Sequence, residues 1–218
     1  MMSAGRSSYQ LEVALAHPDG VEWTALAVDL LADGDRMERL VADLLFLARE
    51  DATHSEPSRD PIDLDVVILE EVARLRARGA VTVDTSAVSG AATRGSREEF
   101  SRLVSNVVEN AMSHARSRVA ISLSETSTGV RMVVSDDGPG VPEGHQDRIF
   151  DRFARVEGSR VRGAGGTGLG LSIARAIAER HGGSISLQGA HQAPGDGARF
   201  LVLLPNAGWR SATGVSAG

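Results

Sequence analysis

The chain has 218 residues, enough for one ordinary domain with an appendage, and 42% of them are apolar, so a buried core is expected. Aromatic residues make up only 4%, which indicates an aliphatic core. The formal net charge of −6 argues against a general nucleic-acid-binding protein. Cysteine is absent, which excludes disulfides, thiolate metal sites and cysteine nucleophiles.

The charge is unevenly distributed along the chain. Residues 1–58 hold eleven acids and four arginines, a net charge of −7 against −6 for the whole chain, so the remainder is about neutral. All 23 basic residues are arginine, so a basic side chain that contacts phosphate must use a guanidinium. No apolar run approaches the roughly 18–20 residues of a membrane helix. We therefore expect no membrane span in this chain and a cytoplasmic location.

The first 60 residues predict a helical segment and a linker. Residues 1–8 are polar and are expected to be a disordered leader. Tyr9–His17 predicts a short helical fragment, and Val21–Glu50 predicts a long helix because its apolar residues recur at three-, four- and seven-residue spacing. Residues 51–60 are polar and proline-flanked, as is typical of a linker.

Residues 61–205 predict one α+β domain, and residues 206–218 a loose tail. The expected strands are Pro61–Leu64, Ala80–Val83, Val119–Ser124, Val130–Ser135, Ser184–Gln188 and Ala198–Leu204. The expected helices are Val66–Arg78 with Asp65 as N-cap, a helix that Ser96 and Glu99 open as a capping box, and Gly168–Arg180. Because this order lacks regular βαβ repeats, we expect a two-layer α/β sandwich with helices on one face of a mixed sheet.

The first motif with chemical content is Asn106-Val107-Val108-Glu109-Asn110-Ala111, on a predicted helix. Asn106 and Asn110 are four residues apart and share a helix face. Their amides are suited to a nucleotide pocket, with the Asn110 oxygen as a ligand for a hard cation such as Mg²⁺. A pair of surface or capping amides is the alternative, and the helix taken alone favours it.

The second motif is Asp136-Asp137-Gly138-Pro139-Gly140, at the end of an apolar strand. Gly138 and Gly140 allow a tight turn and the close approach of a planar ligand. A carboxylate held there is placed to accept a hydrogen bond from the exocyclic amine of adenine. The alternative is a plain Asp-Gly turn.

The third motif, Gly166-Thr167-Gly168-Leu169-Gly170-Leu171, opens a predicted helix. Exposed N–H groups and the helix dipole favour phosphate there. A P-loop is excluded because the Lys-Ser/Thr ending is missing, and a dinucleotide fingerprint is excluded because no strand precedes the run. The preceding Arg152–Arg162 segment predicts a cationic lid, with Phe150 and Phe153 as its anchors. The alternatives are a flexible loop and a solvated basic loop.

In this order, with Phe150-Asp151-Arg152-Phe153 between the last two, the motifs resemble the N, G1, F and G2 boxes of sensor histidine kinases. These kinases belong to the superfamily of gyrase, MutL and the ninety-kilodalton chaperone, and the F box is typical of the kinases. The resemblance covers about residues 60–205 and implies a Bergerat-type fold that binds ATP and Mg²⁺. Residues 35–50 look like the second helix of the family's dimerization hairpin. Residues 9–50 would then be a partial hairpin, with a homodimer possible through helix 21–50.

The resemblance also implies roles for particular residues. Asn106 and Asn110 line the phosphate and Mg²⁺ side, Asp136 reads adenine, Gly138 and Gly140 shape its pocket, and Gly166, Thr167, Gly168, Leu169 and Gly170 carry phosphate contacts. Ser113, followed by His114, stands where the family often has Lys or Arg. One phosphate contact would then be lost, or supplied by Arg155.

The acceptor of the phosphoryl group is missing from the sequence. No His-Glu-x-x-x-Pro motif occurs, and none of the histidines at 17, 54, 114, 145, 181 and 191 has the acceptor context. We therefore expect the ATP-binding catalytic part of a two-component kinase that phosphorylates a histidine supplied in trans or by missing sequence. A response regulator would act downstream, and a full-length parent or partner chain could be membrane-anchored.

Two other functions remain open. One is a gyrase- or MutL-like ATPase in which Glu109 activates water, although the F box and the hairpin helix argue against it. The other is a degenerate nucleotide-binding module that acts only by interaction.

Overall fold

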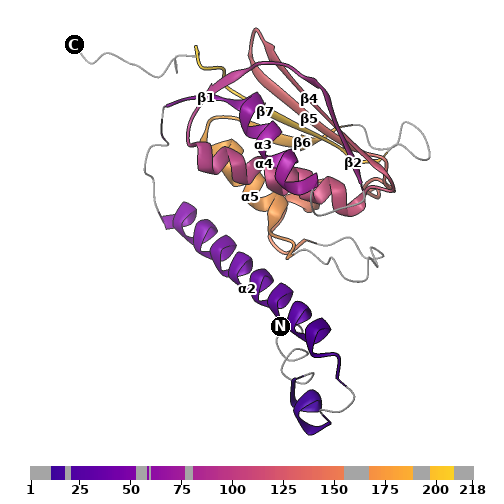
Figure 1. Cartoon of the computed structure of the whole chain (residues 1–218). Coiled ribbons are helices and arrows are strands. Elements are labelled where there is room, and N and C mark those ends of the chain that lie inside the picture. Colours follow the sequence, from indigo (N-terminus) through magenta and orange to yellow (C-terminus); the bar gives the residue numbers. More distant parts are fainter. Residues whose placement is uncertain are drawn as a thin grey trace. The chain divides into compact units, whose positions relative to one another are not determined.

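The computed structural model describes residues 11–17, 21–52, 58, 60–76, 81–154, 167–188 and 197–208. The chain divides into two units, Met1–Thr53 and His54–Gly218. In the first unit, residues 11–16 are helical and α2 (Trp23–Ala52) forms one long helix (Figure 1). No helix in the described part of the chain combines the length and apolarity that a membrane crossing requires.

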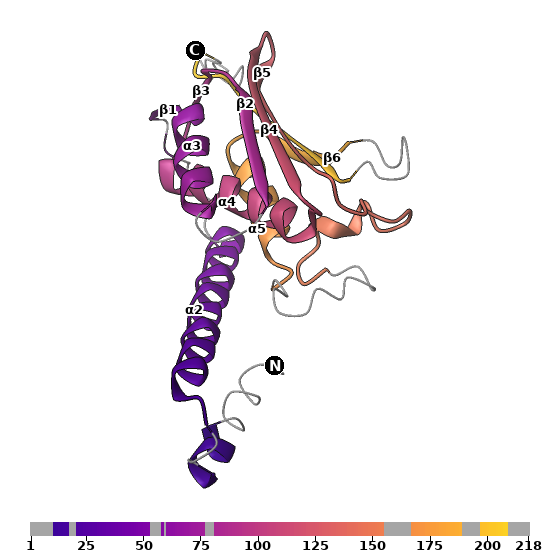
Figure 2. The same cartoon turned by 45° about the vertical axis from the view of Figure 1, so that its right-hand side comes forward.

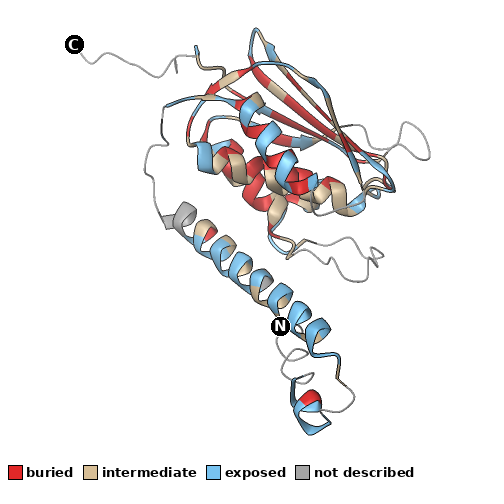
Figure 3. Cartoon of the chain, viewed as in Figure 1, coloured by how far each residue is buried: buried red, intermediate tan, exposed pale blue. Residues whose placement is uncertain are grey.

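Helix α2 begins and ends two residues later than the predicted helix 21–50. Much of its surface is exposed (Figure 3), and this exposed surface includes apolar side chains on several of its turns. They are Trp23, Val28, Leu31, Met37, Val41, Leu44 and Leu45. Met37, Val41 and Leu44 recur at four- and three-residue spacing and share one face of the helix, whereas Val28 and Leu31 lie toward other faces.

The second unit contains a five-stranded sheet in the order β2-β4-β5-β7-β6 and a two-stranded sheet of β1 and β3. The strands are β1 (Pro61–Asp63), β2 (Thr82–Val88), β3 (Ala92–Arg94), β4 (Arg118–Thr126), β5 (Gly129–Asp136), β6 (Ser184–Leu187) and β7 (Arg199–Leu204). In the larger sheet β2 pairs parallel with β4, and the other pairs are antiparallel. The sheet is therefore mixed, as expected.

Three helices cover one face of this sheet (Figures 1 and 2). They are α3 (Leu64–Arg76), α4 (Arg97–His114) and α5 (Gly170–Arg180). Helix α4 lies between the other two, because it packs against both α3 and α5. The buried residues gather where these helices meet the sheet (Figure 3), so the two-layer α+β sandwich is confirmed.

Helix α4 forms as the capping box predicts. The Glu99 N–H donates to the Ser96 hydroxyl at 3.4 Å, and acidic side chains lie in the first turn, where they complement the helix dipole. Its apolar face is fully buried and consists of Phe100, Leu103, Val104, Val107, Val108 and Ala111. Their three- and four-residue spacing places them on one face of the helix.

Two expectations about local structure are wrong. Helix α3 begins at Leu64, so Asp65 lies in the first turn and is not the N-cap. The reason is that the Leu64 N–H still donates to the Ala91 carbonyl at 2.9 Å, and the chain passes directly from β1 into the helix. Strand β2 runs to Val88 instead of ending at Val83. The sequence pattern missed its second half because the pairing with β4 shifts register between Asp84 and Ala87, which interrupts the alternation of buried and exposed residues.

Strand β3 and the short 3₁₀ helix η2 (Arg148–Phe150) have no counterpart among the predicted elements. Thr93 of β3 is fully buried, and its hydroxyl donates to the Pro205 carbonyl at 2.7 Å. Because the bonding partner of Thr93 is distant in the sequence, the residues around Thr93 give no signal that it is buried in a strand.

Candidate functional site

Asp136 ends β5, which lies between β4 and β7 in the sheet. The residue is only 8% exposed. Its Oδ1 accepts hydrogen bonds from the Gly138 N–H at 2.8 Å and the Ala198 N–H at 3.3 Å. Its Oδ2 is buried and has no hydrogen-bond partner among the described residues. One carboxylate oxygen is thus held by the backbone, while the other has no donor among the described residues.

The electrostatics of Asp136 follow from this burial. Desolvation raises the pKa of its carboxyl, while the N–H groups of Gly138 and Ala198 and the charge of His114 oppose the rise. A buried polar atom without a partner is costly. A ligand N–H that reaches Oδ2 would relieve that cost, and the exocyclic amine of adenine is such a donor.

Two glycines allow the backbone to close around Asp136. A Cβ on Gly138 would lie 2.3 Å from the His114 carbonyl oxygen, and a Cβ on Gly197 would lie 2.0 Å from the Asp136 carbonyl oxygen. Gly140, the last residue of the motif, has φ +74°. Three segments of the chain therefore meet at Asp136: the end of α4, the turn after β5 and the entry to β7. Gly197 and Ala198 were not predicted as neighbours of Asp136, because no local motif links them to it.

Asp137 fastens the loop after α4 to this turn. Its carboxylate accepts from the Arg116 N–H at 2.8 Å, the Ser117 N–H at 3.0 Å and the Ser117 hydroxyl at 2.6 Å. These bonds, led by those from Ser117, hold its pKa well below the usual range. The sequence contained Asp137 within a motif but indicated no role for it. The structure makes it the residue that holds the His114 carbonyl beside Gly138.

Asn106 lies against the start of α5. A Cβ on Gly170, the first residue of that helix, would be 3.0 Å from the Asn106 Oδ1. Asn110 is half-buried one turn further along α4, and its carbonyl accepts the Ser113 hydroxyl at 2.8 Å. The structure thus brings the first and third motifs together. The Ser113 hydroxyl is bonded within its own helix.

The described end of the glycine run packs against the F-box segment. The Phe153 N–H donates to the Gly168 carbonyl at 2.9 Å, and a Cβ on Gly168 would lie 2.9 Å from the Phe153 Cα. Both residues have positive φ, +73° for Gly168 and +63° for Phe153. Glycine is therefore required at 168, and Phe153 holds a conformation that side chains rarely adopt.

The aromatic and flanking residues divide into anchors and exposed groups. Phe150 is buried and packs edge-on against Phe200, with ring centroids 6.3 Å apart. Phe153 is 59% exposed, so the prediction that it anchors the segment through its side chain is wrong. Leu169 is fully buried, so its side chain belongs to the core. The Thr167 hydroxyl accepts the Leu169 N–H at 3.3 Å. Of the predicted contacts, Arg155 and Gly166 lie outside the described residues.

Glu109 is half-buried on α4. Its charge helps to raise the pKa of Arg74 on α3, although the bond from Arg74 to Glu71 contributes most. The negative charge of Glu109 thus acts on Arg74 of α3, whereas Asn106 lies beside α5. A role for Glu109 as a base stays a prediction.

Comparison with known proteins agrees with this geometry. Residues 95–208 match the family described as histidine kinase-, DNA gyrase B-, and HSP90-like ATPase. The sensor-like histidine kinase SenX3 of Mycolicibacterium smegmatis is 30% identical over 207 residues, which are 92% of this chain and 53% of that protein. This chain therefore spans about half the length of that relative.

Solved structures show the same likeness. The mycobacterial sensor histidine kinase MprB is 28% identical with a TM-score of 0.59, over 68% of this chain and 97% of that one. Full-length ShkA in complex with AMPPNP is 25% identical with a TM-score of 0.71, over 85% of this chain and 39% of that one.

Proposed function

The chain belongs to the histidine kinase-, DNA gyrase B- and HSP90-like ATPase family, and on this basis we propose that residues 61–205 are the ATP-binding catalytic part of a two-component sensor histidine kinase. The observation that carries the proposal is the buried Asp136 Oδ2, which has no partner among the described residues and stands at the end of β5. Adenine fits this atom because its amine is a donor, and the resulting hydrogen bond to a charged group is a strong one.

The phosphates of ATP would lie at the start of α5. The N–H groups of its first turn and the helix dipole favour an anion there, next to Asn106. We propose Asn110 as the protein ligand of Mg²⁺, since that ion binds oxygen and keeps several of its other sites for water and phosphate. Mg²⁺ and ATP together would supply the transferable γ-phosphoryl group and neutralise its charge.

The chain's own contribution to transfer would be positioning and charge. Phosphoryl transfer needs little covalent help from a protein, so holding the phosphates against a cationic group supplies most of the catalysis. We propose Arg155 as that cation, with Ser113 and His114 at the phosphate and adenine edges of the site. Glu109 remains our candidate for a base in the alternative reaction, hydrolysis of ATP by water.

The acceptor histidine would come from a partner chain or from sequence outside this one. Its phosphate would pass to a response regulator. The exposed side chains of Met37, Val41 and Leu44 on one face of α2 are suited to a homodimer, in which the acceptor helices would pack beside them. We place this part of the kinase in the cytoplasm, where ATP is available.

The test has two stages. Titration with a non-hydrolysable ATP analogue, with and without Mg²⁺, is expected to give saturable binding that Mg²⁺ strengthens. ATP radiolabelled at the γ-phosphate, together with a purified hairpin carrying a His-Glu-x-x-x-Pro sequence, is then expected to label the hairpin. Absence of binding would overturn the nucleotide site. Binding followed by steady phosphate release that Glu109→Gln abolishes, without labelling of any hairpin, would favour the ATPase instead.

A further inference from the structure

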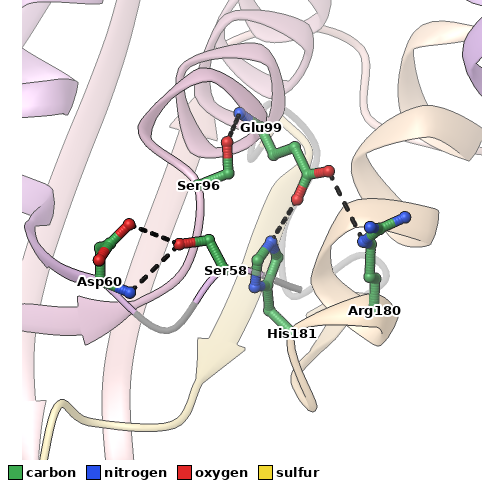
Figure 4. Close-up of polar contacts among 6 residues, drawn as sticks. All are labelled: Ser58, Asp60, Ser96, Glu99, Arg180 and His181. Atoms are coloured by element: carbon green, nitrogen blue, oxygen red, sulfur yellow. Dashed lines mark hydrogen bonds and ion pairs between the residues drawn. The ribbon is translucent and has the colours of Figure 1, made fainter. Parts of the chain in front are cut away.

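Polar contacts join the first turn of α4 to the end of α5 (Figure 4). His181 follows the last residue of α5, and its side chain is 1% exposed. Its Nε2 lies 2.6 Å from the Glu99 Oε2 in the first turn of α4. Arg180 Nε lies 3.6 Å from the other carboxylate oxygen. Glu99 is thus shared by two successive residues at the end of α5.

The charge state of Glu99 matches this arrangement. The hydrogen bond from His181 is the main cause that lowers the pKa of the Glu99 carboxyl, the charge of Arg180 adds to it, and partial burial opposes both. The carboxylate is therefore ionised near neutral pH, and His181 Nε2–H is the donor. A hydrogen bond to a charged group is about twice as strong as one between neutral groups.

The surroundings of the His181 ring are closely packed. The ring lies 4.6 Å from the Phe100 ring between centroids. A Cβ on Gly95 would lie 2.6 Å from the His181 Cε1, so only glycine allows this approach. The Gly95 N–H in turn donates to the Asp60 carbonyl at 2.9 Å, which ties the segment before β1 to the same place. Contacts with Glu99, Phe100 and Gly95 therefore hold the His181 ring in place.

The two helices therefore meet at two defined points. Glu99 and His181 meet at one end, and Asn106 and Gly170 meet at the other. Along α4 these points are seven residues apart, which corresponds to about 10 Å of helix. Leu103 of α4 and Ile173 and Ile177 of α5 lie between these points along the two helices and are fully buried. Apolar contacts are non-directional, so they resist separation of the helices better than sliding or rotation.

We propose that His181 is a positioning residue of the nucleotide site. Through its bond to Glu99 it sets the register of α5 against α4, and it thereby keeps the glycine turn and the first N–H groups of α5 beside Asn106. The inference rests on the proposed nucleotide site and goes beyond it, because His181 acts from the opposite end of the helix and touches no part of the nucleotide.

The test compares three variants for binding of the Mg²⁺ complex of a non-hydrolysable ATP analogue. His181→Leu removes the donor and keeps an apolar side chain of similar size, whereas His181→Gln retains an N–H donor. Glu179→Gln is the matched control, since it breaks the exposed Arg175–Glu179 pair on the same helix. Circular dichroism first establishes a temperature at which each variant is fully folded.

Because coupling between separated sites changes affinity by between about twofold and thirtyfold, His181→Leu is expected to raise Kd within that range. His181→Gln and Glu179→Gln are expected to leave Kd within about twofold of the parent chain, the resolution of such a titration. If His181→Leu does not fold, Glu99→Met takes its place, because methionine has a similar size and no oxygen that accepts from His181.

Three outcomes count against the inference. A folded His181→Leu or Glu99→Met with a lower Tm but an unchanged Kd would make the pair purely structural and overturn the inference. An equal loss of affinity in His181→Gln would show that the hydrogen bond is not the cause. A parent chain that binds no nucleotide would overturn the proposed function first, and the inference with it.

Discussion

The side-chain oxygen of Asn106 lies 3.0 Å from the point where a Cβ on Gly170 would stand. This contact joins the helix motif to the glycine motif, and a Cβ at position 170 would require the Asn106 amide to move by a few tenths of an ångström. Gly170→Ala is therefore expected to displace the Asn106 amide and weaken binding of the ATP analogue several-fold. The Tm should stay the same or rise slightly, because alanine at a helix start costs less backbone entropy than glycine, by up to about 1 kcal/mol. Analogue titration and thermal unfolding measure the two effects separately.

Gly34→Ala is the matched control, since Gly34 lies within α2 and a Cβ there meets no atom within 4 Å. It is expected to raise helix stability by about 0.5–1 kcal/mol and to leave nucleotide affinity unchanged. Equal affinity in Gly170→Ala and the parent chain would mean that Asn106 does not face the phosphates.

Asp136→Asn tests the adenine contact. Asparagine at this position has no negative charge, and in one of its two amide orientations it also presents a donor to the adenine amine. A charge-assisted hydrogen bond worth about 1.5–3 kcal/mol therefore disappears. The affinity for the ATP analogue should then fall on the order of 10- to 150-fold. Asp84→Asn, on the surface strand β2 where Asp84 pairs with Arg118, should leave affinity unchanged. Isothermal titration calorimetry would measure both, and an unchanged Kd in Asp136→Asn would refute the pocket assignment.

Nucleotide affinity should also depend on pH through Asp136. Burial raises its pKa above the ordinary aspartate value of about 4, and only the ionised carboxylate accepts fully from the adenine amine. Affinity is therefore expected to rise as pH increases through this raised pKa and to level off above it. In the absence of nucleotide, the contribution of Asp136 to the free energy of unfolding has the opposite pH dependence. Because its pKa is higher in the folded state, this contribution increases as pH falls. The Asp136→Asn variant should show neither dependence, which a series of titrations at different pH would reveal.

Asp137 should stabilise the folded domain at neutral pH and less so in acid, which is the opposite of the pH dependence expected for Asp136. Its pKa is held well below the usual range in the folded domain, mainly by Ser117, so its stabilisation is fully present above about pH 4 and is lost as pH falls through the folded-state pKa. Asp137→Asn is expected to lower the denaturant midpoint at neutral pH, and the difference from the parent chain should shrink in acid. A difference independent of pH would show that the carboxylate charge is not the stabilising feature.

Gly197→Ala should damage the site from the β7 side. A Cβ at 197 would lie 2.0 Å from a backbone oxygen of Asp136, so the backbone has to move, at a cost of about 1–3 kcal/mol. Both Tm and nucleotide affinity are expected to fall. Gly90→Ala, where a Cβ meets nothing within 4 Å, serves as the control and should change neither. A Gly197→Ala chain with normal Tm and Kd would contradict the close approach.

Local interactions explain which elements were predictable. Helix α4 is encoded by residues close together in the sequence. The Ser96 cap opens it, and apolar side chains three and four residues apart form its buried face. The start of α3 and the strand β3 depend instead on pairing with distant carbonyls of Ala91 and Pro205. No pattern confined to neighbouring residues records such bonds.

The same division applies to the site. For the nucleotide site, the sequence predicts the chemistry, because Asn106, Asp136 and the glycine turn form local motifs in a fixed order. The tertiary structure adds that one Asp136 oxygen is held by Ala198 while the other has no donor among the described residues. It also decided that Glu99 and His181 close the far ends of α4 and α5. Those contacts join residues that are remote along the chain, and folding brings them together only when the helices pack on the sheet.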